Sequence, residues 1–562
     1  MRITTSIEWS KINWAKETKV VAKLQHKIYC YSINNKKASV EAAQKAWVQS
    51  LSAKLLAVRR VSQDNRGKST AGVDGVKSLN ANQRVKLAKT LNLDGKASSI
   101  RRVGIPKPGT SERRPLGIPT MVDRAKQQLA RLALEPEWEA KFEPNSYGFR
   151  PGRSSHDAIE AIYLNINRAP QGKHVLDADI RKCFDTIEHQ ALLNKLQTWP
   201  KMSKQIKAWL KAGVMEGGTL TLAGEAGTLQ GGVISPLLAN IALHGMEDKL
   251  KQWVKTLDLR SQSGKRISPA NRANTLGVIR YADDFVVLHK DLNVVNGARE
   301  QVQQWLAPLG LELKDSKTRL VHTDKTLSNA PAGFDFLGFS VRRYSVGKYS
   351  RGKRGLEAKT LIKPSKDTIT KHLNHIKSKL KDLRLPGHVV NTLNPIIRGW
   401  CNYYKTAVSK RTYNICRQDV YTKLLAWAKR KHANKSSKWV YEKYYVPVGQ
   451  RLNFSADGTR NKVLMNHDET KIVRHVKVKG SASVYDGNDL YWSNRCAHFN
   501  GLNKRESRLL QVQQGLCNWC GERLNVHDML EVDHKTPKAK GGAEAWSNLQ
   551  LLHSYCHDAK HA

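Results

Sequence analysis

Two adjacent aspartates interrupt an apolar segment near the middle of the chain. Residues 278–289 read VIRYADDFVVLH, so Asp283 and Asp284 lie between two short apolar runs of the kind that form buried strands. Aspartate is common in turns, because its carboxylate accepts a hydrogen bond from the backbone two residues further on. The other interpretation is a divalent metal site, since hard cations prefer oxygen ligands. A metal site would require at least one more carboxylate.

A second apolar segment that is broken by acids could supply that carboxylate. The segment HVLDADIRKCFDTIEH contains Asp177, Asp179 and Asp185. If the two segments are neighbouring strands of one sheet, Asp179 faces Asp283 and Asp284. Three carboxylates placed in this way would hold two divalent ions about 4 Å apart, which is the arrangement for in-line phosphoryl or nucleotidyl transfer.

Two further segments could complete such a site. The segment RRVGIPKPGTSERRPLGIPT is a predicted basic hairpin whose Lys107, Arg113 and Arg114 could hold a triphosphate. The segment TLQGGVISP places Gln230 beside two glycines, which would let a nucleotide approach the backbone closely. Taken singly, the first is more often a surface hairpin and the second a plain loop. Their presence in one chain with the aspartates favours a nucleotide site.

The C-terminal part carries two groups of metal-ligating residues. The first has the C-x2-C and H-x2-C spacing of a structural zinc site, with a redox pair as the alternative, and consists of Cys517, Cys520, His553 and Cys556. In the second, His557 and His561 share one helix face and could hold a catalytic divalent ion together with Asp533. His534 would be free to act as general base on water. Alternatively, these are surplus zinc ligands or surface histidines.

The composition restricts the class of protein. A chain of 562 residues is too long for one core and predicts about three or four folded units. Its 95 Lys and Arg against 48 Asp and Glu give a charge of +47, which predicts nucleic acid as the partner. We find no apolar run that could span a membrane and no signal peptide. Scattered cysteines favour a reducing compartment, and we expect the bacterial cytoplasm, with an organelle as the alternative.

Much of the positive charge is concentrated in one region. Residues 341–480 hold 33 Lys or Arg and 8 Asp or Glu. Aromatic residues are interleaved with these charges: Trp400, Tyr403, Tyr404, Tyr413, Tyr421, Trp427, Trp439, Tyr441, Tyr444 and Tyr445. Cations that follow phosphates and flat rings that stack on bases predict a nucleic-acid surface. The alternative is a helical core with a hydrated exterior.

The elements that must position these residues follow from the pattern of the chain. Residues 1–100 have a helical and basic pattern, and residues 101–322 alternate apolar runs with helical patterns, which indicates an α/β or α+β domain. Within that domain, Ser235 is predicted as the N-cap of a helix and Pro236 as its first residue. The chain to about residue 435 is helix-rich, and residues 440–495 are polar and mixed.

Seven segments, in this order, resemble the group II intron reverse transcriptases: RRPLGIPT, NSYGFRPGRS, DADIRKCFDTI, QGGVISPLLANI, RYADDF, DSKT and GFDFLGF. The resemblance implies an α+β, right-hand polymerase fold with fingers, palm and thumb. It implies that Asp179, Asp283 and Asp284 bind two Mg²⁺ ions. The remaining nucleotide-binding residues that it implies are Lys107 and Arg114 at the triphosphate, Phe184 as the steric gate against the 2′-hydroxyl, and Gln230 at the nascent pair. Leu229 stands where the family usually has proline.

Two later segments extend the resemblance. LNPIIRGWCNYYK is similar to the family's thumb or maturase region, and the RNA-binding candidates around it are Arg398, Trp400, Tyr403, Lys405, Lys410 and Arg411. The terminal unit resembles HNH nucleases, a small ββα-metal fold with structural zinc. That resemblance implies a metal-binding Asp533, with Mg²⁺ or Mn²⁺ as the ion, a water-activating His534 and a loop-ordering Asn548. His553 stands where cysteine is commoner.

The resemblance therefore implies a multifunctional intron-encoded protein. It would bind its intron RNA and promote splicing, nick target DNA, and copy RNA into DNA from dNTPs. The implied domains are an N-terminal extension with the start of the fingers (1–100), fingers and palm (101–340), thumb and maturase region (341–438), a DNA-binding region or linker (439–495), and the HNH domain (496–562). The alternatives are a splicing maturase whose polymerase is a scaffold, and a retroelement polymerase without splicing duty.

Overall fold

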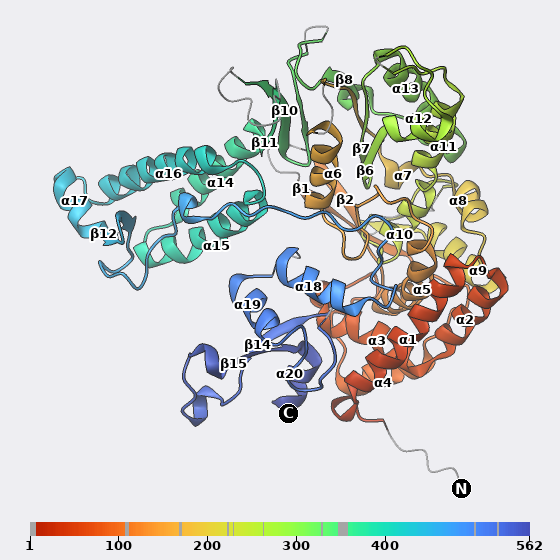
Figure 1. The fold of residues 1–562 in the computed structure, drawn as a ribbon. Coiled ribbons are helices and arrows are strands. Elements are labelled where there is room, and N and C mark those ends of the chain that lie inside the picture. Colours follow the sequence, from red (N-terminus) through yellow and green to blue (C-terminus); the bar gives the residue numbers. More distant parts are fainter. Residues whose placement is uncertain are drawn as a thin grey trace.

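The computed structural model describes most of the chain. The described residues are 7–106, 112–167, 171–217, 219–221, 224–228, 230–261, 263–327, 330–346, 358–499, 502–524 and 528–561. They form a mixed α and β fold, as predicted, in which helices at the N-terminus are followed by sheets, a helical arm and a small C-terminal unit (Figure 1). No helix among these residues is both long and apolar enough to cross a membrane.

Four helices precede the first sheet: α1 (Trp14–Ile33), α2 (Lys37–Gln49), α3 (Leu51–Arg59) and α4 (Ala81–Thr90). The first three pack against α5 (Met121–Glu139), which is buried along almost its whole length. Trp47 of α2 is fully buried, and its indole Nε1 donates a hydrogen bond of 3.2 Å to the carbonyl of Leu129. The predicted helical N-terminal region is confirmed.

A four-stranded sheet in the order β2-β1-β4-β5 follows. Its strands are β1 (Ile100–Pro106), β2 (Arg113–Ile118), β4 (Val214–Glu216) and β5 (Thr219–Thr221). β1 and β2 form the predicted basic hairpin, which pairs in antiparallel register from Arg101 opposite Ile118 to Pro106 opposite Arg113. The tip of the hairpin lies outside the described residues.

The second four-stranded sheet, in the order β6-β7-β3-β8, is the centre of the fold. Its strands are β3 (His174–Asp179), β6 (Gly277–Tyr281), β7 (Asp284–His289) and β8 (Arg319–His322). Successive side chains enter different hydrophobic cores, since Leu176 belongs to the core that contains α13 and Val175 to the core that contains α6. Burial on both faces explains why these strands read as continuous apolar runs.

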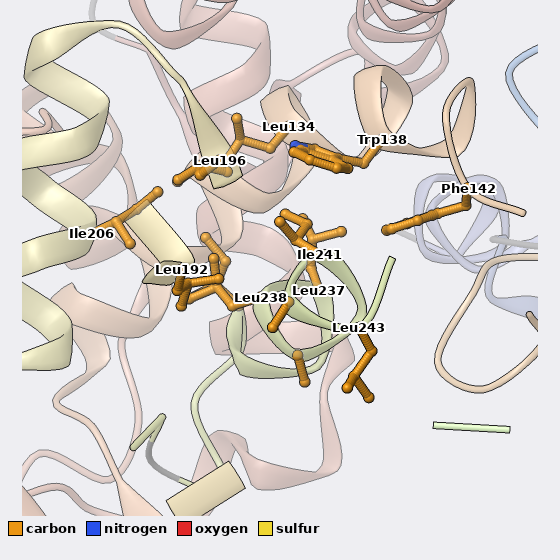
Figure 2. Packing of buried hydrophobic residues seen from close by; sticks show 14 of the residues in the cluster. Leu134, Trp138, Phe142, Leu192, Leu196, Ile206, Leu237, Leu238, Ile241 and Leu243 are labelled. Carbon is orange, nitrogen blue, oxygen red and sulfur yellow. The ribbon is translucent and has the colours of Figure 1, made fainter. Parts of the chain in front are cut away.

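Helices surround these sheets. They are α6 (Ser155–Asn167), α7 (Cys183–Thr186), α8 (His189–Leu196), α9 (Pro200–Leu210), α10 (Ser235–Ala242), α11 (Met246–Thr256), α12 (Pro269–Thr275) and α13 (Leu292–Leu306). Figure 2 shows Leu237, Leu238 and Ile241 of α10 packed among side chains of α5, α8 and α9. Ser235 is the first residue of α10 and makes no cap, because Ile234 holds the N-cap position, so that prediction was wrong by one residue.

The helical arm, residues 366–444, extends away from the central sheet (Figure 1). It consists of α14 (Lys366–Asp382), α15 (Pro386–Tyr404), α16 (Lys410–Lys431) and α17 (Ser437–Tyr444). A three-stranded sheet connects it to the centre through β9 (Phe334–Phe336), β10 (Phe339–Ser345) and β11 (Ala358–Pro364). A hairpin of β12 (Tyr445–Val448) and β13 (Arg451–Phe454) follows the arm.

The burial of aromatic residues between Trp400 and Tyr445 contradicts part of the prediction of an exposed stacking surface. Five of the ten are buried, namely Tyr404, Tyr413, Trp427, Tyr444 and Tyr445. These five residues do not form an exposed stacking surface. Tyr404, Tyr413, Trp427 and Tyr444 lie on helices whose spacing turns them toward the hydrophobic core of the arm, whereas Tyr445 begins β12 and borders a cavity. The basic residues occupy the solvated face, so the interpretation as a helical core with a hydrated exterior describes this part of the region better.

The C-terminal unit lies beside the N-terminal helices (Figure 1). It contains α18 (Asp489–Phe499), α19 (Lys504–Val512), β14 (Leu530–His534), β15 (Leu549–His553) and α20 (Ser554–Lys560). β14 and β15 are antiparallel, with Asp533 opposite Gln550. The predicted ββα arrangement is confirmed.

Candidate functional sites

The central sheet brings the three predicted carboxylates together at one edge. Asp179 ends β3 and lies directly opposite Asp284, the first residue of β7. Asp283 occupies the tight turn between β6 and β7, in which Ala282 adopts a left-handed φ of 57°. The amide of Ile180 donates a hydrogen bond of 3.3 Å to the carbonyl of Asp283. Strand pairing therefore fixes the positions of all three acids.

Burial and mutual repulsion raise the pKa values of two of these acids, Asp283 and Asp284. Burial, followed by the charges of Asp283 and Asp179, raises the pKa of Asp284 to about 7. Burial also raises the pKa of Asp283, while Lys317 and Arg114 oppose that shift. Hard oxygen donors that repel one another when ionised fit divalent cations, whose charge would offset the repulsion. The residues present therefore suit the metal ions that the sequence predicted.

Lys317, which was not among the predicted site residues, contacts the triad of Asp179, Asp283 and Asp284 through Asp179. The Nζ atom of Lys317 lies 2.5 Å from Oδ2 of Asp179. The side chain of Lys317 is more than half exposed, so this contact can yield to another cation. The neighbouring Asp177 is paired with Arg319 at 2.9 Å, which leaves it outside the triad. The DSKT motif is the one sequence signal that pointed to Lys317.

Three of the other predicted nucleotide-binding residues lie among the described residues, each on a different element. Phe184 packs edge-on against Phe149 with 6.0 Å between ring centroids. Arg114 is an exposed residue of β2 whose charge acts on Asp283. The carbonyl of Gln230 accepts a hydrogen bond of 2.6 Å from the amide of Gly117, which ties its loop to β2. Lys107 and Leu229 lie outside the described residues.

The C-terminal unit holds two candidate metal groups. One consists of Cys517, Cys520, His553 and Cys556, and the other of Asp533, His557 and His561. Within each group the possible ligand atoms lie within 4.8 Å of one another. The first group offers three thiolates and one imidazole, a ligand set that suits zinc. The second group offers one carboxylate and two imidazoles, which suit a catalytic divalent ion. The structure thus brings together both sets of residues that were predicted from spacing.

Asp533 is the centre of the second group. Its Oδ1 lies 2.8 Å from Nε2 of His561, and its Oδ2 lies 2.6 Å from Nζ of Lys560. Burial would raise the pKa of Asp533, but hydrogen bonds from Lys560, His561 and Gln550 hold it below its usual range. These contacts therefore favour the ionised carboxylate, which is the form that binds a cation. Lys560 was missed, because its proximity to Asp533 arises only from the packing of α20 on β14.

His534 has a partner that the sequence did not reveal. Its Nε2 lies 3.1 Å from Oε2 of Glu544, and hydrogen bonds from Lys538, His534 and Arg505 lower the pKa of that glutamate to about 2. An ionised Glu544 can orient the imidazole. Asn548 bonds the intervening loop at both ends, with its Nδ2 3.0 Å from the carbonyl of Thr536 and 2.9 Å from that of Ala543. These bonds agree with the loop-ordering role predicted for Asn548.

The predicted RNA-binding residues divide into two sets. Arg398 and Arg411 are exposed, and Lys410 is exposed with its Nζ 2.5 Å from the carbonyl of Asp468. Lys405 is half-buried. The remaining two, Trp400 and Tyr403, are also half-buried, because Trp400 stacks on His372 at 4.5 Å and the hydroxyl of Tyr403 donates to the carbonyl of Leu337 at 2.9 Å. The exposed basic residues are the better candidates for RNA contact.

Four known protein families match successive parts of the chain. The family described as reverse transcriptase (RNA-dependent DNA polymerase) matches residues 105–341, and the N-terminal domain of reverse transcriptase matches residues 9–91. The maturase-specific domain of group II introns matches residues 367–445, and the HNH endonuclease family matches residues 517–562. Fold and sites together define an RNA-directed DNA polymerase that also carries an HNH endonuclease domain.

Three relatives indicate which kind of reverse transcriptase the chain resembles. Protein YkfC of Escherichia coli K12 is 33% identical over 311 residues, which are 50% of this chain and 79% of YkfC. The group II intron-encoded protein LtrA of Lactococcus lactis subsp. cremoris is 29% identical over 422 residues, 61% of this chain and 67% of LtrA. Maturase-like protein 1 of Euglena longa is 24% identical over 477 residues, 79% of this chain and 92% of the relative. The chain belongs to the group II intron-encoded reverse transcriptases, and the homology to maturases implies that it binds intron RNA.

The endonuclease helix α20 is held by the N-terminal helices. Arg59 of α3 is almost fully buried, and its Nη2 lies 2.9 Å from Oδ2 of Asp558. Gln63 donates a second hydrogen bond of 3.3 Å to the same oxygen. Asp558 follows His557 directly on α20, so this contact connects the reverse transcriptase part of the chain to the helix that carries the second candidate metal group.

We expect Asp558→Asn to lower DNA nicking about ten-fold and to leave primer extension unchanged, since small displacements of catalytic groups are costly. Nicking of a labelled DNA duplex and extension of a primed RNA template would be measured on the same preparation. Glu522→Gln is the matched control, because Glu522 contacts Lys19 at 2.5 Å in an exposed pair that contributes little. Equal nicking by both variants and the unmodified protein would show that the contact does not position α20.

Proposed function

We propose that the chain copies RNA into DNA at the edge of the central sheet, where Asp179, Asp283 and Asp284 would bind two Mg²⁺ ions. The observation that carries this proposal is the pairing of Asp179 with Asp284 beside the Asp283 turn. Divalent ions bound there would promote deprotonation of the attacking hydroxyl and stabilise the leaving oxygen. The domain boundaries expected from the sequence are part of this proposal.

The protein's own residues would bind and orient the dNTP. Arg114 of β2 and Lys107, which follows β1 in the sequence, would bind the triphosphate as charged donors. Phe184 would exclude a 2′-hydroxyl by its bulk, and Gln230 would contact the nascent base pair. Lys317 would keep the Asp179 carboxylate paired until the nucleotide and its cations arrive, which is supported by their 2.5 Å contact.

We assign the DNA nicking activity to the second metal group. Asp533, His557 and His561 would hold a divalent ion, either Mg²⁺ or Mn²⁺, against the scissile phosphate. His534 would accept a proton from water, with Glu544 holding the imidazole in place. The four residues Cys517, Cys520, His553 and Cys556 would bind Zn²⁺ as a structural ion that joins the segment between α19 and β14 to the end of β15 and to α20.

The protein would use its activities one after another, first on the intron RNA and then on the target DNA. The basic surface that includes Arg398, Lys405, Lys410 and Arg411 would bind the intron RNA and promote its splicing. The endonuclease would then nick target DNA, and the polymerase would extend the new 3′ end with dNTPs while it copies the intron RNA. A bacterial cytoplasmic location stays a prediction.

Splicing is tested directly with precursor RNA that contains the adjoining intron. At a low Mg²⁺ concentration at which the RNA alone does not splice, we expect the protein to restore splicing. Asp179→Ala should restore it equally, because the polymerase carboxylate takes no part in RNA folding. The scaffold alternative predicts the same splicing but no DNA synthesis by the unmodified protein. Failure of the protein to restore splicing would contradict the maturase assignment.

A further inference from the structure

A cavity of about 290 Å³ lies on the helical arm, between α16 and the β12–β13 hairpin. It is lined by residues of α16, α17, the β12–β13 hairpin and residues 464–467. Its aromatic and polar lining includes Arg417, Gln418, Tyr421, Tyr441, Tyr445 and Arg451. Aromatic rings, amides and arginines in one cavity are the chemistry that binds single-stranded nucleic acid.

Three tyrosine rings form one wall of the cavity. Tyr441 stacks on Tyr445 with 5.0 Å between centroids and an angle of 18° between the ring planes. Tyr421 lies 5.3 Å from Tyr445 at an angle of 57°. Tyr421 and Tyr441 are half-exposed, so part of each ring is open to a ligand. Apolar side chains such as Leu424 complete the lining, which suits a flat base.

The charges beside the rings suit a phosphate. Arg417 Nε lies 3.8 Å and Arg451 Nη1 lies 2.6 Å from the same atom, Oδ2 of Asp468. Asp468 is buried, whereas both arginine side chains are partly exposed. Two guanidinium groups against one carboxylate leave a positive charge at the cavity, where the guanidinium groups could also donate to phosphate oxygens.

Tyr445 supplies an independent indication of a ligand. It is 6% exposed and lines the cavity. Its hydroxyl is buried and has no hydrogen-bond partner among the residues that the structure describes. A buried hydroxyl without a partner destabilises a protein, so such a group in a native fold requires an explanation. A ligand with a polar edge in the cavity would provide the missing partner.

We propose that this cavity binds one unpaired nucleotide of the intron RNA. The base would stack on Tyr441 and accept or donate a hydrogen bond at the Tyr445 hydroxyl, and the phosphate would lie near Arg417 and Arg451. The proposal rests on the RNA binding proposed above and adds a specific site, remote from the polymerase carboxylates, that selects unpaired over paired RNA. Paired bases are excluded because their stacking faces are covered in a helix.

The sharpest test is Tyr445→Phe in the full-length protein, with intron RNA as the probe. The variant removes the hydroxyl and keeps the ring, so we expect an unchanged or higher thermal unfolding temperature together with an RNA affinity about five-fold lower. A merely structural hydroxyl would not lower the affinity. Tyr441→Ala should weaken binding about ten-fold, whereas Tyr441→Phe, which keeps the stacking ring, should bind as the unmodified protein does.

Cross-linking locates the contact independently. Intron RNA with photoactivatable thiouridine should cross-link to the peptide that contains Tyr441 and Tyr445, and single-stranded RNA should compete better than a duplex of the same composition. Unchanged affinity in Tyr445→Phe and Tyr441→Ala, with cross-links only elsewhere, would overturn the cavity proposal while intron RNA binding stands. Equal competition by the duplex would also overturn it. If the unmodified protein does not bind intron RNA, the proposed function fails as well.

Discussion

Asp283→Ala is expected to abolish primer extension with Mg²⁺ and to leave RNA affinity intact. The substitution removes one of three carboxylates that meet where β3 and β7 pair. Bound metal supplies several kcal/mol of transition-state stabilisation, so the rate should fall by about 10³-fold or more. Extension of a DNA primer on an RNA template would be measured under single-turnover conditions, with RNA binding measured by filter retention on the same preparation.

Asp258→Ala provides the control for this variant. Asp258 lies in an exposed loop after α11, where it contacts Arg260 and Arg266, so its loss should leave extension unchanged. If Asp283→Ala extended primers at the rate of the unmodified protein, the catalytic assignment of the triad would be wrong. If the same variant also lost RNA binding, the carboxylate would have a structural role that we do not propose.

His534→Ala should stop nicking of the target strand and leave polymerisation intact. A positioned general base contributes about 10²–10⁴-fold to such a reaction, so nicking should fall within that range. Glu544→Gln should have an intermediate effect of about ten-fold, because the imidazole remains but loses its charged partner at 3.1 Å. Nicked product would be quantified from an end-labelled duplex over time.

Zinc content is the internal control for both endonuclease variants. Neither His534 nor Glu544 belongs to the Cys517, Cys520, His553 and Cys556 group, so bound zinc should equal that of the unmodified protein. A fall in zinc content would show that the domain had unfolded. A simultaneous loss of nicking and polymerisation with zinc retained would contradict the independence of the two sites.

The motifs that carry the catalytic residues could be predicted from the sequence because the pattern of each motif is local. Acids at the ends of apolar strands indicate a sheet edge, and the turn between β6 and β7 is short enough to fix Asp283 beside Asp284. The ligand spacings of the C-terminal unit likewise follow from short motifs: the Cys517–Cys520 pair before β14, and the His and Cys residues at the end of β15 and on α20. Each motif carries the information about its own residues, whereas the approach of Asp179 to Asp284 depends on the pairing of β3 with β7.

The partners of the catalytic residues could not be predicted, because tertiary packing creates them. Lys317 reaches Asp179 only when β3 and β8 are adjacent, and Glu544 reaches His534 across a loop. The aromatic residues of the arm were misjudged for a related reason. Composition alone does not distinguish rings that stack on bases from rings such as Tyr413, which is fully buried between helices.

Target-primed DNA synthesis requires the endonuclease and the polymerase to act in turn on one DNA strand, so it tests both assignments in one reaction. A complex of the protein with its intron RNA would be given a DNA duplex that spans the insertion site, with labelled dNTPs, and the covalent linkage of product to DNA would be measured. We predict labelled DNA joined to the 3′ end of the nicked strand, nicked but unextended DNA with Asp283→Ala, and neither product with His534→Ala. Labelled product that is never joined to the nicked strand would show that the endonuclease does not supply the primer for the polymerase.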